Sequence, residues 1–211
     1  MKHFNIEDLD NMPSRYRAHL INSCTGYKSA NLLGSKSNTG NTNLAIFNSV
    51  IHIGSTPPML GFILRPLTVK RNTYSNFKKT GFFTVNQVNK DIIDDAHHTS
   101  ANYAEDISEF SKTNLTESYL DDFPAPYVKE SDIKLGCSYV NEYEIKENGC
   151  ILIIGAIEHI YLPDEILDED GWLQLDKANG VAINGLDAYA LPTLLARFAY
   201  AKPNKPTITI S

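Results

Sequence analysis

The sequence has no excess of positive charge. Its 19 Lys and Arg residues are outnumbered by 25 Asp and Glu residues, so the formal net charge is −6, and no basic run stands out. Binding of nucleic acid requires a basic patch or stripe, so we expect no nucleic-acid partner. A small local cluster of cations that holds a single phosphate group is still compatible with this composition.

Long apolar runs and a signal peptide are also missing. The longest run, Cys150 to Ile157, is interrupted by Gly155 and is far shorter than the roughly 18 residues of a membrane span. The first 12 residues carry three acidic side chains and no apolar segment of the kind that signal peptides contain. We therefore expect a cytoplasmic protein with no membrane partner.

Cysteine is scarce, and its spacing fits neither a disulfide framework nor a metal site. Cys24, Cys137 and Cys150 form no C-x-x-C pair, and an odd number of separated cysteines is typical of reduced thiols. His97 and His98 are adjacent, so on a helix they would diverge by about 100 degrees and could not bind one metal ion from one face. The expectation is that the protein holds no metal.

The motifs of several enzyme classes are absent. The sequence has no G-x-G-x-x-G, no G-x-S-x-G and no H-E-x-x-H. The glycine-rich stretch from Gly34 to Gly40 lacks the Gly-Lys-Ser/Thr ending of a phosphate-binding loop and is better interpreted as a hairpin turn. An enzyme without these motifs could still be one that leaves its chemistry to a cofactor.

The hydrophobic pattern predicts at least six strands and few helices. A break at Thr56-Pro57-Pro58 separates two of the strands, because proline cannot donate to a strand ladder. This pattern predicts a single, mainly β domain over residues 1–211, a β-barrel with short α-helical insertions. The expected strands are Ser29–Ser37, Asn43–Ile53, Met59–Leu64, Phe82–Val88, Cys137–Lys146 and Cys150–Leu162.

Two short helical segments are expected between the strands. The first is a helix over about Val69 to Thr80, with Thr68 as N-cap and Gly81 after its end. The second is a turn over Ile107 to Lys112, because Asp106 and Glu109 have capping-box spacing.

Asn148-Gly149 is the strongest hairpin signal in the sequence. A two-residue turn there would place Ile145 opposite Leu152 and Cys137 opposite Ile160. Because Cys137 would not face Cys150, this register also predicts that the two cysteines form no disulfide.

Polar and cationic side chains gather around the Pro-Pro break. Asn48 and Ser49 interrupt an apolar strand, while Arg65, Arg71 and Thr73 surround the start of the expected helix. Arg side chains, hydroxyl groups and the free N–H groups of a helix N-terminus are the donors that bind a phosphate best. The alternative interpretation is that both arginines are solvated surface charges and Ser49 is an ordinary strand residue.

The order of these blocks resembles the flavin-reductase-like family, which includes flavin reductases and flavoredoxin. The resemblance extends in order over about residues 15 to 204. The blocks that carry it are Asn43–Val50, Gly54–Met59, Arg65-Pro66, Arg71–Asn76, Thr80–Asn86, Ala96–Ala101, Ser108–Phe110, Asp122–Pro126, Glu130-Ser131, Gly155 and Asp170-Gly171.

This resemblance implies an FMN-binding split β-barrel, usually a homodimer with the flavin near the subunit interface. Carried over by position, Asn48, Ser49 and Val50 would line the isoalloxazine, although Asn48 stands where many relatives have a small hydroxyl residue. The phosphate would be held by Arg65, Arg71 and Thr73, and the pocket would be closed by His98, Thr99 and Ser100. The family implies no single catalytic side chain.

Three functions are compatible with this resemblance. The first is an NAD(P)H:flavin oxidoreductase, in which the nicotinamide delivers hydride to FMN and the electrons pass to a flavin or a small acceptor. The second is a flavoredoxin-like electron carrier with little nicotinamide turnover. The third is a non-redox binding module, because a fold does not fix a function.

Overall fold

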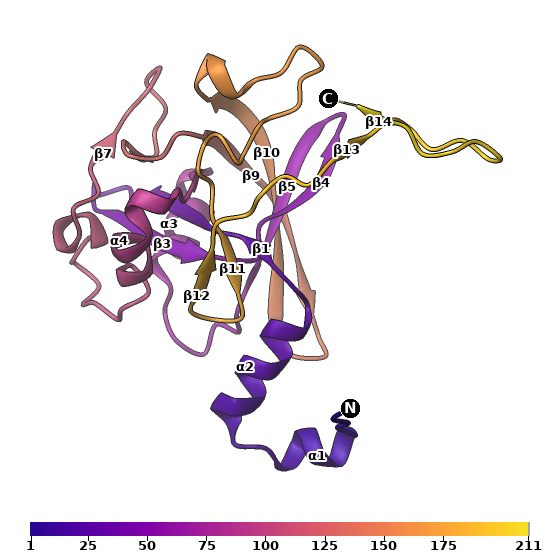
Figure 1. Ribbon diagram of the computed structural model, residues 1–211. Helices are drawn as coiled ribbons and strands as arrows, with labels where there is room; N and C mark the ends of the chain where they lie inside the picture. The colour runs from indigo at the N-terminus through magenta and orange to yellow at the C-terminus, as the bar shows by residue number, and fades with distance from the viewer. Residues whose placement is uncertain (211) are drawn as a thin grey trace.

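A seven-stranded antiparallel sheet forms the centre of the computed structural model, which describes residues 1–210 (Figure 1). Its strand order is β3-β2-β6-β9-β10-β5-β4. In chain order these strands are β2 (Asn31–Lys36), β3 (Thr42–Phe47), β4 (Ile51–Ser55), β5 (Pro58–Leu64), β6 (Phe82–Gln87), β9 (Lys134–Ile145) and β10 (Cys150–Tyr161).

Three smaller sheets accompany the large one. They are made of β1 (Lys28–Ser29) with β11 (Ala182–Asn184) and β12 (Ala188–Ala190), of β7 (Glu117–Ser118) with β8 (Tyr127–Val128), and of β13 (Arg197–Phe198) with β14 (Thr209–Ile210). The mainly β expectation is confirmed.

The helices are short and lie outside the sheet. In Figure 1, α3 and α4 lie beside the strands, whereas α1 and α2 extend away from the body. None of the helices in residues 1–210 is long and apolar enough to cross a bilayer. The helices are α1 (Ile6–Asn11), α2 (Ser14–Cys24), α3 (Asn72–Thr80) and α4 (Ile93–His98), and the 3₁₀ turns are η1 (Lys90–Ile92), η2 (Glu109–Lys112) and η3 (Asp164–Ile166).

The connection between β3 and β4 curls the sheet. These two strands are its opposite edges, yet only three residues, Asn48 to Val50, separate them in the sequence. Such a short link can join the two edges only if the sheet bends round until they meet, since extended chain spans at most about 3.6 Å per residue. The sheet therefore curls into a barrel at this point.

Aromatic side chains fill the barrel. Phe62 and Phe83 are fully buried with ring centroids 5.5 Å apart, and Phe77 of α3 lies 6.0 Å from Phe62. Both pairs have the edge or tilted geometry that aromatic rings prefer. Phe77 thus fixes α3 against the barrel, and with it the position of the helix N-terminus.

Two of the predicted elements have different boundaries in the structure. The strand predicted over Asn43 to Ile53 is wrong as one element, because Asn48 to Val50 leave the ladder and the chain continues as β4 at another edge. The helix begins at Asn72 with Arg71 as N-cap, not after Thr68, although Gly81 ends it as expected with φ +84°.

The hairpin register was also predicted wrongly. Ile145 pairs with Cys150, so the loop has four residues and the N–H of Gly149 donates to the carbonyl of Ile145 at 2.8 Å. Leu152 consequently lies opposite Tyr143, and Cys137 lies opposite Ile157. All three cysteines are free, in agreement with the absence of a disulfide.

The capping box at Asp106 does not form. The 3₁₀ turn η2 starts at Glu109 after Ser108, and its N-cap makes no side-chain hydrogen bond. The Glu109 carboxylate instead accepts a hydrogen bond from the N–H of Leu44 at 2.8 Å, on the neighbouring strand β3. Glu109 therefore makes a contact with a distant strand instead of the local cap that its spacing from Asp106 suggested.

We expect Gly34→Ala to destabilise the fold by about 1–3 kcal/mol through overpacking. A Cβ atom at Gly34 would collide with the carbonyl oxygen of Pro126 and lie 2.6 Å from the Oγ1 of Thr84. Gly54→Ala is the matched control, because its Cβ would be 3.5 Å from its nearest neighbour, the carbonyl oxygen of Pro57. Urea denaturation measures both variants, and equal stabilities for the two would contradict the prediction.

Candidate functional site

A cavity of about 460 Å³ lies where the barrel closes. Its wall is formed by β3 and the residues after it, the segment after β5, the first turn of α3, the end of α4 and the β11–β12 connection. The residues that line it are Asn43, Ala45, Ile46, Phe47, Asn48, Ser49, Ile63, Leu64, Arg65, Val69, Lys70, Arg71, Asn72, Thr73, His97, Thr99, Ser100, Ala101, Asn102, Tyr103, Glu105, Glu109, Ile183, Leu186 and Tyr189.

Seven of the nine side chains that the sequence indicated line this one cavity, and two do not. The seven are Asn48, Ser49, Arg65, Arg71, Thr73, Thr99 and Ser100. Val50 packs beside the barrel core instead, and His98 is exposed, with its ring 6.0 Å from that of Tyr103. Its neighbour His97 lines the cavity in its place.

The first turn of α3 brings free donors to the cavity wall. Arg71, Asn72 and Thr73 line the cavity, and Arg71 is an extended N-cap residue with no side-chain cap hydrogen bond. The first N–H groups of a helix have no partner within the helix. Together with the helix dipole, they make an uncapped N-terminus a favourable place for an anion.

Arg71 and Thr73 add side-chain donors at the same place. The Nε of Arg71 is buried and has no hydrogen-bond partner within residues 1–210. Thr73 is buried, and its Oγ1 accepts a hydrogen bond from Asn43 Nδ2 at 3.0 Å. Because that oxygen acts as the acceptor, the hydroxyl proton of Thr73 is left to donate.

Ser49 and Asn48 are held by the fold. The Oγ of Ser49 donates to the carbonyl of Ile63 at 3.2 Å and accepts from the N–H of Ile63 at 3.1 Å. Asn48 Nδ2 donates to the carbonyl of Gly185 at 3.2 Å. The Ser49 hydroxyl therefore fixes this part of the cavity wall to β5. The amide oxygen of Asn48 remains available as an acceptor.

Cations and carboxylates both reach the cavity. Arg65 is exposed at its edge, and Lys70 forms an ion pair with Glu105 that joins the segment after β5 to the loop after α4. Asn72 Nδ2 also donates to the carbonyl of Glu105 at 3.1 Å. These two contacts hold the two segments together beside the first turn of α3.

The sequence did not indicate Glu109 as a site residue, but the structure places it in the wall. It is 9% exposed, and burial raises the pKa of its carboxyl group, while the hydrogen bond from the N–H of Leu44 acts in the opposite direction. In the sequence, the spacing of Glu109 from Asp106 suggested that Glu109 caps a local turn, so its position in the cavity wall was not predicted. No sequence signal marks the contact with β3, which is 65 residues away.

His97 and Tyr189 form the other polar pair of the wall. The Nδ1 of His97 and the hydroxyl of Tyr189 are 3.0 Å apart. Burial, with a smaller contribution from the charge of Asp187, raises the pKa of Tyr189 to about 12, so this phenol is neutral at physiological pH. Tyr103 contributes a further buried hydroxyl that has no partner among the described residues.

Thr99 and Ser100 follow α4 at the cavity. Thr99 is buried, and its hydroxyl donates to the carbonyl of Ala96 at 2.8 Å, whereas Ser100 is exposed.

Within residues 1–210 no group of three or more His, Cys, Asp or Glu residues could hold a metal ion. The chemistry that this wall supports is thus the binding and orientation of a polar, anionic ligand.

Comparison with known proteins gives one family and several structural relatives. Residues 28–182 match the model of the flavin reductase like domain. An uncharacterized protein of Methanothermobacter thermautotrophicus is 30% identical over 112 residues, which are 52% of this chain and 53% of that protein. The chain thus matches about half the length of this curated relative.

Two solved structures resemble the fold closely. A candidate flavin reductase with a split-barrel domain from Shewanella frigidimarina is 45% identical, with a TM-score of 0.92 and coverage of 95% of this chain and 100% of that one. Flavoredoxin of Desulfovibrio vulgaris has a TM-score of 0.70 at 20% identity, covering 85% of this chain and 92% of that one, which shows a common fold alone. Since the family model spans most of the sequence and the curled sheet matches these barrels, the chain belongs to the flavin reductase-like family and has its split-barrel fold.

Proposed function

We propose that this chain binds FMN in the cavity and acts as an NAD(P)H-dependent flavin reductase. The observation that carries the proposal is the buried, unpartnered Nε of Arg71 beside an uncapped helix N-terminus. Leaving a buried donor unpaired costs roughly 1–3 kcal/mol, and an anion bound there would remove that cost. The phosphate of FMN has the charge and the acceptor oxygens that this donor set fits.

Different residues of the wall would bind different parts of FMN. Arg71, the hydroxyl of Thr73 and the first N–H groups of α3 would hold the phosphate, with Arg65 at the edge of the cavity adding charge. Asn48 and Ser49 lie farther along, at the break between β3 and β4, where they would line the ring. The hydrogen bonds of these two residues to Gly185 and Ile63 keep this part of the wall in position.

The chemistry in this proposal belongs to the cofactor. When bound, FMN supplies a ring that accepts hydride from NAD(P)H and passes electrons on to a flavin or another small acceptor. The chain's own contribution is to hold and orient the cofactor and to shield it from water. The lack of a nucleophile or metal motif is consistent with this division, because the proposal requires neither.

Arg71→Ala should weaken FMN binding by about 1.5–3 kcal/mol, because a charge-assisted hydrogen bond is lost. This corresponds to a dissociation constant that rises roughly 10- to 150-fold. Titration of the apo protein with FMN, followed by quenching of flavin fluorescence, gives the constant directly.

Riboflavin provides the internal control for this experiment, because it lacks the phosphate. Its affinity should be the same for Arg71→Ala and the parent protein, so the preference for FMN over riboflavin should shrink. Arg15→Ala, on the exposed face of α2, is the matched control variant and should change neither affinity. An unchanged FMN dissociation constant in Arg71→Ala would remove Arg71 from the site.

The purified protein with FMN should oxidise NADH or NADPH in the steady state, with electrons passing to added flavin. The measurement is the loss of nicotinamide absorbance with each nucleotide in turn. Negligible rates with a retained yellow cofactor would instead indicate a flavoredoxin-like carrier. A colourless protein that does not bind FMN would indicate a non-redox binding module and would exclude the proposed activity.

A further inference from the structure

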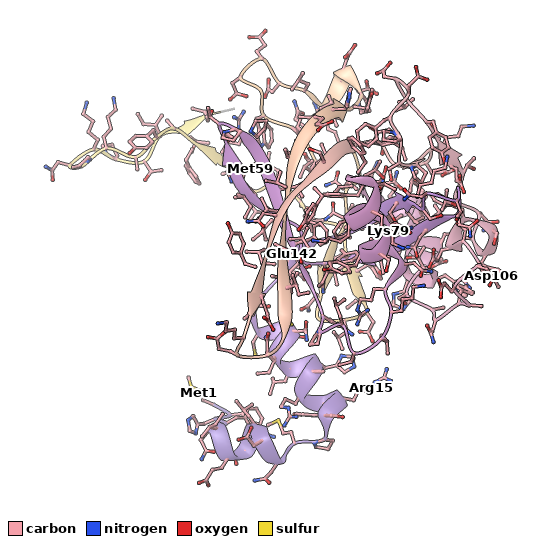
Figure 2. All side chains as sticks on the ribbon, turned by 180° about the vertical axis from the view of Figure 1, so that it is seen from behind. Met1, Arg15, Met59, Lys79, Asp106 and Glu142 are labelled. Atoms are coloured by element: carbon pink, nitrogen blue, oxygen red, sulfur yellow. The ribbon has the colours of Figure 1, made fainter. Side chains whose placement is uncertain are left out.

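The loop that follows α4 turns a single side chain inward. In the stretch 100–106, between α4 and η2, every residue is exposed except Tyr103. Figure 2 labels Asp106 at the end of this stretch and shows it at the edge of the body. Tyr103 is thus an aromatic side chain that points inward from an otherwise exposed loop.

This loop is fastened beside Arg71. Glu105, two residues after Tyr103, forms the ion pair with Lys70, and its carbonyl accepts the hydrogen bond from Asn72 Nδ2 at 3.1 Å. Lys70 and Asn72 are the sequence neighbours of Arg71, so Glu105 is bound on both sides of it. Because extended chain spans at most about 3.6 Å per residue, Tyr103 also lies close to the first turn of α3.

The Tyr103 hydroxyl has no use within its own chain. It is buried and has no hydrogen-bond partner among residues 1–210, although Tyr103 lines the cavity. The ring itself is held, because it packs edge-on against His98 with the ring centroids 6.0 Å apart. Buried polar groups are nearly always paired, since an unpaired one loses its hydration without compensation. The hydroxyl is therefore expected to have a partner outside the chain.

The cavity has a second unpaired atom of this kind, the Nε of Arg71. The other buried polar side-chain atoms without a partner in residues 1–210 belong to residues that do not line the cavity. Two unpaired donors on segments that Glu105 joins indicate a ligand group with several acceptor atoms at this place. A phosphate monoester offers such oxygens together with a charge of about −1.5 to −2 at pH 7.

We infer that the Tyr103 hydroxyl donates a hydrogen bond to the phosphate of the bound flavin, together with Arg71. The inference rests on the proposed function, which supplies FMN as the ligand, and it adds a binding residue that the sequence did not indicate. Tyr103 is then a specificity residue, because its hydroxyl stabilises a flavin with a phosphate and contributes nothing to the binding of riboflavin. A hydroxyl donor provides this preference without a further charge in the wall.

Tyr103→Phe tests the inference, because it removes one oxygen atom and keeps the ring. The FMN dissociation constant of the apo protein, measured by quenching of flavin fluorescence, should rise about tenfold or more, as expected when a hydrogen bond to a charged group is lost. The riboflavin dissociation constant should not change. Tyr16→Phe is the matched control, since Tyr16 is 53% exposed on α2, and it should change neither constant.

The unfolding temperature of the apo protein separates binding from a structural role. Since the Tyr103 hydroxyl has no partner in its own chain, Tyr103→Phe should leave the unfolding temperature unchanged or raise it. A lower unfolding temperature would show that the hydroxyl stabilises the fold, and it would overturn the inference.

The binding results distinguish this inference from the proposed function. An unchanged FMN dissociation constant in Tyr103→Phe, alongside weaker binding in Arg71→Ala, would remove Tyr103 from the site and leave the proposed function standing. Equal losses of affinity for FMN and riboflavin would place the hydroxyl on another part of the flavin and overturn the phosphate contact. A parent protein that binds no FMN would overturn the proposed function itself, and this inference with it.

Discussion

The closure of the barrel depends on two hydrogen bonds between the Ser49 hydroxyl and the main chain of Ile63, which hold the short link between β3 and β4 against β5. Here the chain passes from one edge strand of the seven-stranded sheet, β3, to the other, β4, through Asn48 to Val50. The Ser49 side chain ties this link to β5 by donating to the carbonyl of Ile63 at 3.2 Å and accepting from its N–H at 3.1 Å, just beyond the end of the β4–β5 ladder. The link that closes the barrel is thereby fixed, and Asn48 and Ser49 of this link form part of the cavity wall.

The positions of the polar groups around this cavity also depend on how the barrel is packed. Phe77 packs α3 on the barrel so that the first turn of the helix, with Arg71 and Thr73, reaches the wall. Glu109 lies in the same wall, and burial raises the pKa of its carboxyl, which favours the neutral form. The contribution of Glu109 to the free energy of unfolding would decrease as pH rises from the pKa of this carboxyl in the unfolded state to its higher pKa in the folded state, because only the folded state keeps the proton over that range. The cavity thus combines strong donors with a carboxyl group whose charge is disfavoured, an environment suited to an anion.

Strand and helix types, the hairpin at Asn148-Gly149 and the helix end at Gly81 could be predicted from the sequence, but the passage of the chain from β3 to β4 and the register of the hairpin could not. Alternation of apolar residues is a local signal, and it marked β5 and β6 well. The sequence showed that Asn48 and Ser49 interrupt an apolar stretch but not that β3 ends there, because the partners of these two side chains, Gly185 and Ile63, are distant in the sequence. The choice of His97 over His98 at the cavity depends likewise on Tyr189, a residue 92 positions away.

The packed part of the protein and its two extensions have different physical roles. Neither α1 nor α2 has a buried residue, and neither has the segment 191–210, so the buried apolar core lies between Ala30 and Ile183. That span nearly coincides with the part that matches the family, residues 28–182. Burial of apolar area is the main stabilising contribution to a fold, so the barrel requires little from the extensions. The cavity that we propose for FMN lies in this packed part and not in the extensions, because all of its lining residues fall between Asn43 and Tyr189.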